Sequence, residues 1–200
     1  LLRDVWMPGL QVMCARDKEN SIEGFFVAAQ GGHNAESHNH NDVGNFVLYV
    51  DGQPVIIDVG VETYTRKTFS SERYNIWTMQ SGFHNLPTIN GTMQQEGREF
   101  AARHVAYRAD EDRVEFSLDI AGAYPASAEV KSWVRRIALN RGTSLQIVDE
   151  FELKSYREPS EWNLMTPCAV DLAGSGQIEL RLAGGGRVVL RFDPSLLIAK

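Results

Sequence analysis

The sequence predicts an all-β fold, an antiparallel β-sandwich of two stacked sheets with one short helix. Runs rich in β-branched and aromatic residues recur along the 200 residues, and glycine, asparagine, aspartate and proline separate them. Residues 113–120 (RVEFSLDI) alternate between polar and apolar side chains, as expected of a strand with one wet and one buried face. Because no linker-like stretch interrupts the pattern, we expect residues 1–200 to form a single domain.

The strands are expected where apolar, β-prone runs lie between turn residues. In chain order they cover residues 11–16, 24–30, 45–50, 54–59, 100–108, 113–120, 130–139, 144–153, 177–182 and 187–192. The clearest hairpin joins residues 45–50 to residues 54–59, because Asp51-Gly52 supplies the positive φ angles of a two-residue turn.

The segment of residues 68–80 departs from the β pattern and is predicted to hold the short helix. The hydroxyls of Ser70 and Ser71 can cap free amides at a helix start, and the carboxylate of Glu72 favours the positive end of the helix dipole. Further along, Gly184-Gly185-Gly186 predicts a turn between the last two strands, since no Lys-Ser/Thr pair follows it to make a phosphate loop.

The charge balance argues against a nucleic-acid binder. Acidic residues outnumber basic ones, 26 to 20, which gives a formal net charge of −6, whereas nucleic-acid binding requires a basic surface. The basic residues form no concentrated run, and Arg135-Arg136 is an isolated pair. The longest apolar runs are far shorter than the ~20 residues of a membrane span.

The chain begins at Leu1, and no signal-peptide pattern follows, so we expect a mature product or a piece of a longer protein. Two cysteines, Cys14 and Cys168, are far apart in the sequence. They allow one long-range disulfide or two unpaired thiols, and the sequence leaves both open.

Potential metal ligands gather in one quarter of the chain. Four of the five histidines fall within residues 33–84, and His38 and His40 form an H-x-H pair. Alternate residues of an extended chain point to the same side, so two such imidazoles can converge on one ion. With Asp58 and His84 they offer a His/Asp/His set, which suits zinc better than calcium or magnesium.

This set requires the chain to bend. A two-residue turn pairs Asp58 with Asn45, which leaves His40 about 16 Å away on a straight strand at ~3.3 Å per residue. We therefore expect a bend near Gly44. The alternatives are that the H-x-H pair is solvated, that Asp58 caps a turn and that His84 lies on the surface.

Two tyrosines are further candidates for chemistry. Tyr64 and Tyr74 each have an arginine close in the sequence, and a cationic neighbour can lower a phenol pKa enough for acid–base work. The alternative is that both rings pack in the core with Phe69 and Trp77.

Several stretches resemble a known family. Residues 31–46 (GGHNAESHNHNDVGNF) and 54–58 (PVIID) resemble the C-terminal β-sandwich domain of heparinase II/III-like polysaccharide lyases. Residues 73–81 (RYNIWTMQS) and 84–91 (HNLPTING) continue the likeness. The match is specific over roughly residues 11–105.

The resemblance implies a lyase that cleaves uronate polysaccharides, heparin/heparan sulfate-like or alginate-like, by β-elimination. In that reaction a base removes the C5 proton and an acid protonates the departing O4, while donors on the uronate carboxylate stabilise the enolate-like state. Carried over by position, His40, Asp58 and His84 are implied to be ligands of a structural zinc ion. His38 is implied to face the substrate as carboxylate neutraliser or proton acceptor, and Tyr74 matches a tyrosine used in some relatives.

The resemblance also implies what this chain lacks. Full-length relatives join an N-terminal helical toroid to the sandwich, and the toroid supplies further catalytic residues. We therefore expect this chain to fold and bind zinc without cleaving polysaccharide alone. The expected partners are an acidic polysaccharide and the toroid of the same longer chain, in a secreted or periplasmic bacterial protein.

Two other functions are weighed against this one. The first is a non-catalytic carbohydrate-binding or interface module with purely structural histidines. The second is a cupin-like metalloenzyme, because Gly32 precedes His38 at the spacing of the cupin metal motif. Gly44 and Asn45 stand where that motif requires a glutamate.

Overall fold

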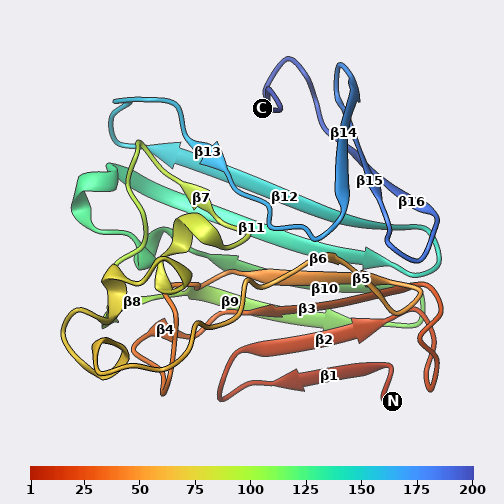
Figure 1. Cartoon of the computed structure of the whole chain (residues 1–200), viewed down its shortest axis with the longest axis horizontal. Coiled ribbons are helices and arrows are strands. Elements are labelled where there is room, and N and C mark those ends of the chain that lie inside the picture. Colours follow the sequence, from red (N-terminus) through yellow and green to blue (C-terminus); the bar gives the residue numbers. More distant parts are fainter.

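The computed structural model describes residues 1–172 and 174–200 in full, with Ala173 described only as part of a strand. Its strands form antiparallel sheets, the two largest stacked on one another (Figure 1). The predicted β-sandwich is thereby confirmed. None of the helical segments that the structure describes has the length and apolarity needed to span a membrane. Cys14 and Cys168 are both free thiols, so the disulfide alternative is not realised.

The first large sheet has the strand order β1-β2-β3-β5-β6. Its strands are β1 (Asp4–Met7), β2 (Val12–Arg16), β3 (Phe25–Gln30), β5 (Phe46–Val50) and β6 (Gln53–Ile56). The second has the order β12-β11-β10-β9. Its strands are β9 (Arg103–Ala109), β10 (Arg113–Asp119), β11 (Val130–Asn140) and β12 (Ser144–Leu153).

Smaller sheets flank the sandwich. One, at the right of Figure 1, consists of β14 (Ala169–Gly174), β15 (Gln177–Arg181) and β16 (Arg187–Arg191). Short strand pairs join β4 (His33–Asn34) to β8 (Gly97–Ala101), and β7 (Pro87–Thr88) to β13 (Glu161–Trp162). The glycine-rich turn lies between β15 and β16 as predicted, with Gly185 and Gly186 at positive φ.

The predicted hairpin forms around the Asp51-Gly52 turn. Both turn residues have positive φ, 50° and 74°, and Val50 pairs with Gln53 across the turn. The expected strand of residues 100–108 is instead two strands, because the chain changes partner at Ala102. Its amide donates to the Gly32 carbonyl at 2.9 Å, which ends β8 before β9 begins to pair with β10.

The predicted short helix is a series of separate 3-10 turns rather than an α-helix. The turns are η1 (Lys67–Phe69), η2 (Arg73–Asn75), η3 (Trp77–Met79) and η4 (Ser81–Phe83). The Ser70 hydroxyl does accept the Glu72 amide at 3.1 Å, as a capping residue would. The turns do not propagate because Ser70, Ile76 and Gln80 have extended backbones. Two further turns, η5 (Ala121–Ala123) and η6 (Ala126–Ala128), precede β11.

The core fills the space between the two large sheets. On β10 the predicted alternation is confirmed, because Val114, Phe116 and Leu118 are fully buried while the residues between them are partly exposed. The facing sheet contributes Met13, Ala15, Val27, Ala29, Phe46 and Leu48. The long segments that follow β4 and β6 gather at the left end of Figure 1.

Candidate metal centre and adjoining groove

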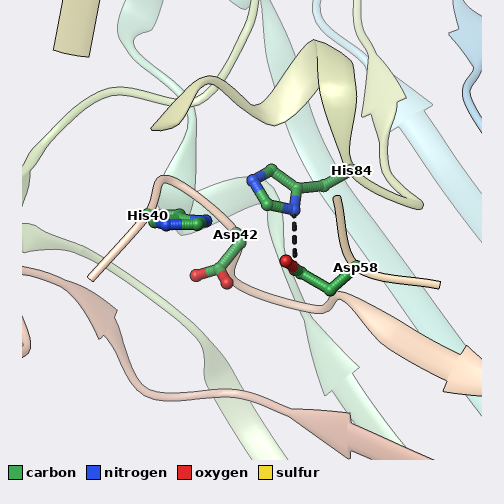
Figure 2. Close-up of side chains that lie close together, drawn as sticks. All are labelled: His40, Asp42, Asp58 and His84. Atoms are coloured by element: carbon green, nitrogen blue, oxygen red, sulfur yellow. Dashed lines mark hydrogen bonds and ion pairs between the residues drawn. The ribbon is translucent and has the colours of Figure 1, made fainter. Parts of the chain in front are cut away.

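Four side chains from three segments meet at the loop-rich end of the sandwich. His40 and Asp42 lie between β4 and β5, Asp58 follows β6, and His84 follows η4. One donor atom of each lies within 4.8 Å of the donor atoms of the others (Figure 2). The structure thus brings together the three ligands predicted from the sequence and adds Asp42.

The bend predicted at Gly44 brings His40 back toward Asp58. Gly44 has φ +88°, a left-handed conformation that strains other residues, and a Cβ there would lie 2.7 Å from Cγ2 of Ile120. Its amide donates to the Gln30 carbonyl at 2.9 Å, which fixes the bend against β3. Only glycine therefore fits this point of close approach.

His84 is fully buried, so the alternative that it lies on the surface is wrong. Its Nε2 lies 3.1 Å from the Thr78 carbonyl oxygen, and its Nδ1 lies 3.1 Å from Oδ2 of Asp58. A neutral imidazole has only one N–H, so one of these two oxygen contacts requires a second proton or a cation. The natural arrangement is an Nε2–H donated to Thr78, which leaves Nδ1 free for a positive ion beside Asp58.

Asp58 both caps a turn and faces the cluster. Its Oδ1 accepts the Gly60 amide at 2.7 Å, so the turn-capping alternative is correct for one oxygen. Its Oδ2 accepts from Nδ2 of Asn45 at 3.0 Å and faces His84. The cap and the Asn45 amide fix the carboxylate plane, which leaves the second oxygen aimed at the other ligands.

The four titratable side chains of the cluster lie close together, and their environment shifts their pKa values. Burial raises the pKa of Asp42 to about 6, against the lowering effect of His84. Burial also lowers the pKa of His40, and the charges of His84 and Arg73 add to that effect. Burial acts to lower the pKa of His84, but the hydrogen bond to Asp58 and the nearby carboxylates outweigh it and raise the pKa. Two carboxylates and two imidazoles this close together are stabilised by a divalent cation.

Asp42 is the ligand candidate that the sequence reasoning missed. The signal was present, because Asp42 continues the every-second-residue spacing of His38 and His40. His38 itself is not in the cluster. It is exposed, with a left-handed φ of 58°, and it lines a groove beside the His/Asp cluster.

This groove is open and shallow, with a volume of about 480 Å³, and segments 35–39 and 68–74 line it. Tyr74 lies in it beside His38, and its hydroxyl donates to Oδ1 of Asn39 at 2.9 Å. Arg73 donates to the Asn39 carbonyl from Nε and Nη2, at 3.2 and 2.8 Å. The two predicted catalytic residues, His38 and Tyr74, therefore lie in one groove. Asn39, which also lines this groove, directly precedes His40 of the cluster.

Aromatic rings border the groove. Tyr64 lies parallel to His38, with ring centroids 6.2 Å apart, and Phe69 stands edge-on to both. Tyr64 is 47% exposed and Phe69 68%, so the alternative that Tyr64 packs in the core with Phe69 is wrong, while Tyr74 is partly buried. Trp77 is also exposed, at 43%. Exposed rings beside polar groups are typical of binding surfaces, because each ring offers an apolar face next to hydrogen-bonding groups.

Comparison with known protein families identifies the domain. A family model described as "Heparinase II/III-like, C-terminal" matches residues 12–195. The chain belongs to this family. The matched family is not the one that the cupin-like alternative requires. A comparison with curated proteins finds no match.

Solved structures of the family have the same fold. The heparan sulfate lyase HepC from Pedobacter heparinus, in a mutant form, matches with a TM-score of 0.72 at 14% identity, over 96% of this chain and 29% of that chain. A heparinase III structure matches with a TM-score of 0.76 at 14% identity, over 95% of this chain and 28% of that one. This chain therefore spans less than a third of these relatives.

Proposed function

We propose that this chain is the β-sandwich domain of a lyase that cleaves uronic-acid polysaccharides, heparin/heparan sulfate-like or alginate-like, by β-elimination. The observation that carries the proposal is the position of the His38–Tyr74 groove directly beside the His/Asp cluster. Family membership supports the same reaction, since the solved relatives are named as heparan sulfate lyase and heparinase III. The substrate class also supports a secreted or periplasmic location, which we include in the proposal.

The metal in this proposal is zinc, held by His40, Asp58 and His84 with Asp42 as a fourth donor. Zinc takes nitrogen and oxygen ligands at 2.0–2.2 Å in a tetrahedron, which separates neighbouring donors by about 3.4 Å. Donors already within 4.8 Å of one another reach that geometry by small side-chain movements. When bound, the ion would fix the loop of residues 38–42 and so the position of His38.

His38 and Tyr74 are the residues that we place at the sugar. In the elimination the C5–H and C4–O4 bonds break, a C4–C5 double bond forms, and the C5 proton goes to a base while O4 receives a proton. His38, exposed in the groove, neutralises the uronate carboxylate or accepts the C5 proton. Tyr74, whose hydroxyl donates to Oδ1 of Asn39, is the residue that exchanges a proton with the sugar in this proposal.

The complete active site in this proposal includes a helical toroid from the same longer chain. Its support is that this chain spans only 28–29% of the two solved lyases compared above. We therefore expect the 200-residue chain alone to release no unsaturated uronate, detected by near-ultraviolet absorbance, from heparan sulfate or alginate. Release of that product by the isolated chain would contradict the expected need for a second domain.

The role of His38 is tested in the longer parent protein. His38→Ala is expected to lower kcat by about 10²–10⁴-fold, the usual contribution of a positioned proton-transfer group, while the fold stays intact. The control is His104→Ala, because His104 is also exposed and lies on β9, outside the groove. Full activity of the His38 variant would favour the non-catalytic, sugar-binding alternative.

Metal binding is expected to weaken on acidification. Asp42 binds a metal as a carboxylate, which is present above its pKa of about 6, and protons compete with the ion for the imidazoles of His40 and His84 below neutrality. The zinc affinity is therefore expected to fall between about pH 7.5 and about pH 5, because protons compete with the ion for these ligands more strongly as the pH falls. Zinc dissociation constants measured by chelator competition at a series of pH values test this. A zinc dissociation constant that does not change between about pH 7.5 and about pH 5 would exclude these residues as ligands.

A further inference from the structure

Two adjacent arginines of β11 face opposite sides of the second sheet. Arg136 pairs with Glu150 of β12 at 2.9 Å on the exposed face. Arg135 is only 1% exposed and forms an ion pair with the buried Asp149. The pair that appeared isolated in the sequence therefore has one surface member and one member inside the sandwich.

The Arg135 guanidinium contacts three different segments. Nε and Nη2 donate to the two oxygens of Asp149, at 2.8 and 2.6 Å. Nη1 donates to the carbonyl oxygens of Gly44, at 3.1 Å, and Asn85, at 2.7 Å. Nε1 of Trp162 donates to the same carboxylate at 2.7 Å, which fixes Asp149 in turn.

The two carbonyls belong to the segments that carry the metal cluster. Gly44 follows Asp42 by two residues and forms the bend that returns His40 to the site. Asn85 directly follows His84. One planar guanidinium with donors in a fixed fork thus binds both segments at once and sets the distance between them.

Stability alone does not account for this pair. Removing two charges from water costs several kcal/mol, and replacing a buried ion pair by apolar residues is often neutral or stabilising. Burial acts to lower the pKa of Arg135, but the charge and hydrogen bonds of Asp149 raise it, so the guanidinium stays charged. An apolar pair could fill this space but could donate no hydrogen bond to the two carbonyls.

We infer that Arg135 is a positioning residue, which holds the Gly44 and Asn85 segments at the separation that the His40–Asp42–Asp58–His84 cluster needs to bind its ion. The inference deepens the metal-binding part of the proposed function and rests on it. It makes no use of the sugar chemistry, because Arg135 is buried behind the cluster and does not line the groove.

The test uses a double variant, Arg135→Met/Asp149→Leu, which removes both charges and so leaves no unpaired buried ion. The matched control is Arg136→Met, the same substitution one residue along the strand on the exposed face. Near-ultraviolet circular dichroism and thermal unfolding establish that each variant is folded. Two readouts follow: the zinc dissociation constant by chelator competition, and the NMR resonances of the His40 and His84 rings with all metal removed.

We expect zinc affinity to fall by about 10–100-fold in the double variant, as for loss of an outer-shell partner, and its metal-free ring resonances to shift or broaden. Arg136→Met should match the wild type in both. A folded double variant with wild-type affinity and wild-type rings would overturn the inference. If the wild type binds no zinc, the metal proposal fails. The metal-free ring resonances still test Arg135, because changed resonances in the double variant would support its positioning role and unchanged resonances would overturn it. If the double variant does not fold, the test uses Arg135→Lys, which keeps the charge but lacks the planar fork of donors. This variant is expected to show the same loss of zinc affinity and the same change in the ring resonances. Wild-type affinity and wild-type rings in Arg135→Lys would overturn the inference.

Discussion

Replacing His84 by alanine is expected to lower zinc affinity by at least about 100-fold, because loss of even an outer-shell partner costs 10–100-fold. His84 is the most enclosed member of the cluster, and its ring lies between the Thr78 carbonyl and the Asp58 carboxylate. Alanine removes a ligand nitrogen and also leaves Thr78 and Asp58 without their shared partner. The expected loss of unfolding free energy in metal-free protein is about 2–4 kcal/mol, from the cavity and the unpaired polar groups.

The matched control for this prediction is His33→Ala. His33 lies on β4, at the start of the same polar segment, and its Nε2 pairs with Glu36 at 3.1 Å rather than with the cluster. Zinc content by elemental analysis and affinity by chelator competition should therefore stay at the wild-type level in this control. If His84→Ala binds zinc as tightly as His33→Ala, His84 is not a metal ligand and acts only as a structural side chain.

Local patterns predicted most of the sandwich. The alternation in β10 and the Asp51-Gly52 turn are properties of a few consecutive residues, so periodicity and turn chemistry were sufficient to find them. Strand β1, of four residues, is too short to show a period. The 3-10 turns after β6 were predicted as one helix because the Ser70 cap is local, whereas the extended backbone at Ile76 that interrupts them is not visible in the sequence.

The candidate site also has some residues that the sequence could predict and others that it could not. His40, Asp58 and His84 were found because residue type and family resemblance mark them, and Gly44 was found because the ligand set required a bend. Asp42 was missed although it continues the every-second-residue spacing of His38 and His40, because an aspartate is a less specific sign of a metal site than a histidine. Arg135 could not be found, because the carbonyl that it binds at Gly44 lies 91 positions away and accepts through its backbone. Every residue has a backbone carbonyl, so the residue type does not show which carbonyl accepts a hydrogen bond.

Asn85→Ala is expected to cost about 3–5 kcal/mol of unfolding free energy, among the largest effects of any single substitution in the chain. Asn85 is 1% exposed. Its Nδ2 donates to the carbonyls of Phe46, at 2.7 Å, and Ile57, at 2.9 Å, and its Oδ1 accepts the Met165 amide at 2.7 Å. Each partner left unpaired in the interior costs about 1–3 kcal/mol.

The same substitution at Asn163 separates this effect from the general cost of losing an amide. Asn163 is only partly buried and donates to the Leu86 carbonyl at 3.0 Å and the Thr88 hydroxyl at 3.2 Å. Water can replace these contacts, so Asn163→Ala should cost about 1 kcal/mol. Urea unfolding of both variants with chelator present measures the difference without any contribution from metal. Equal losses would mean that the buried hydrogen bonds of Asn85 contribute no more to stability than the partly exposed hydrogen bonds of Asn163.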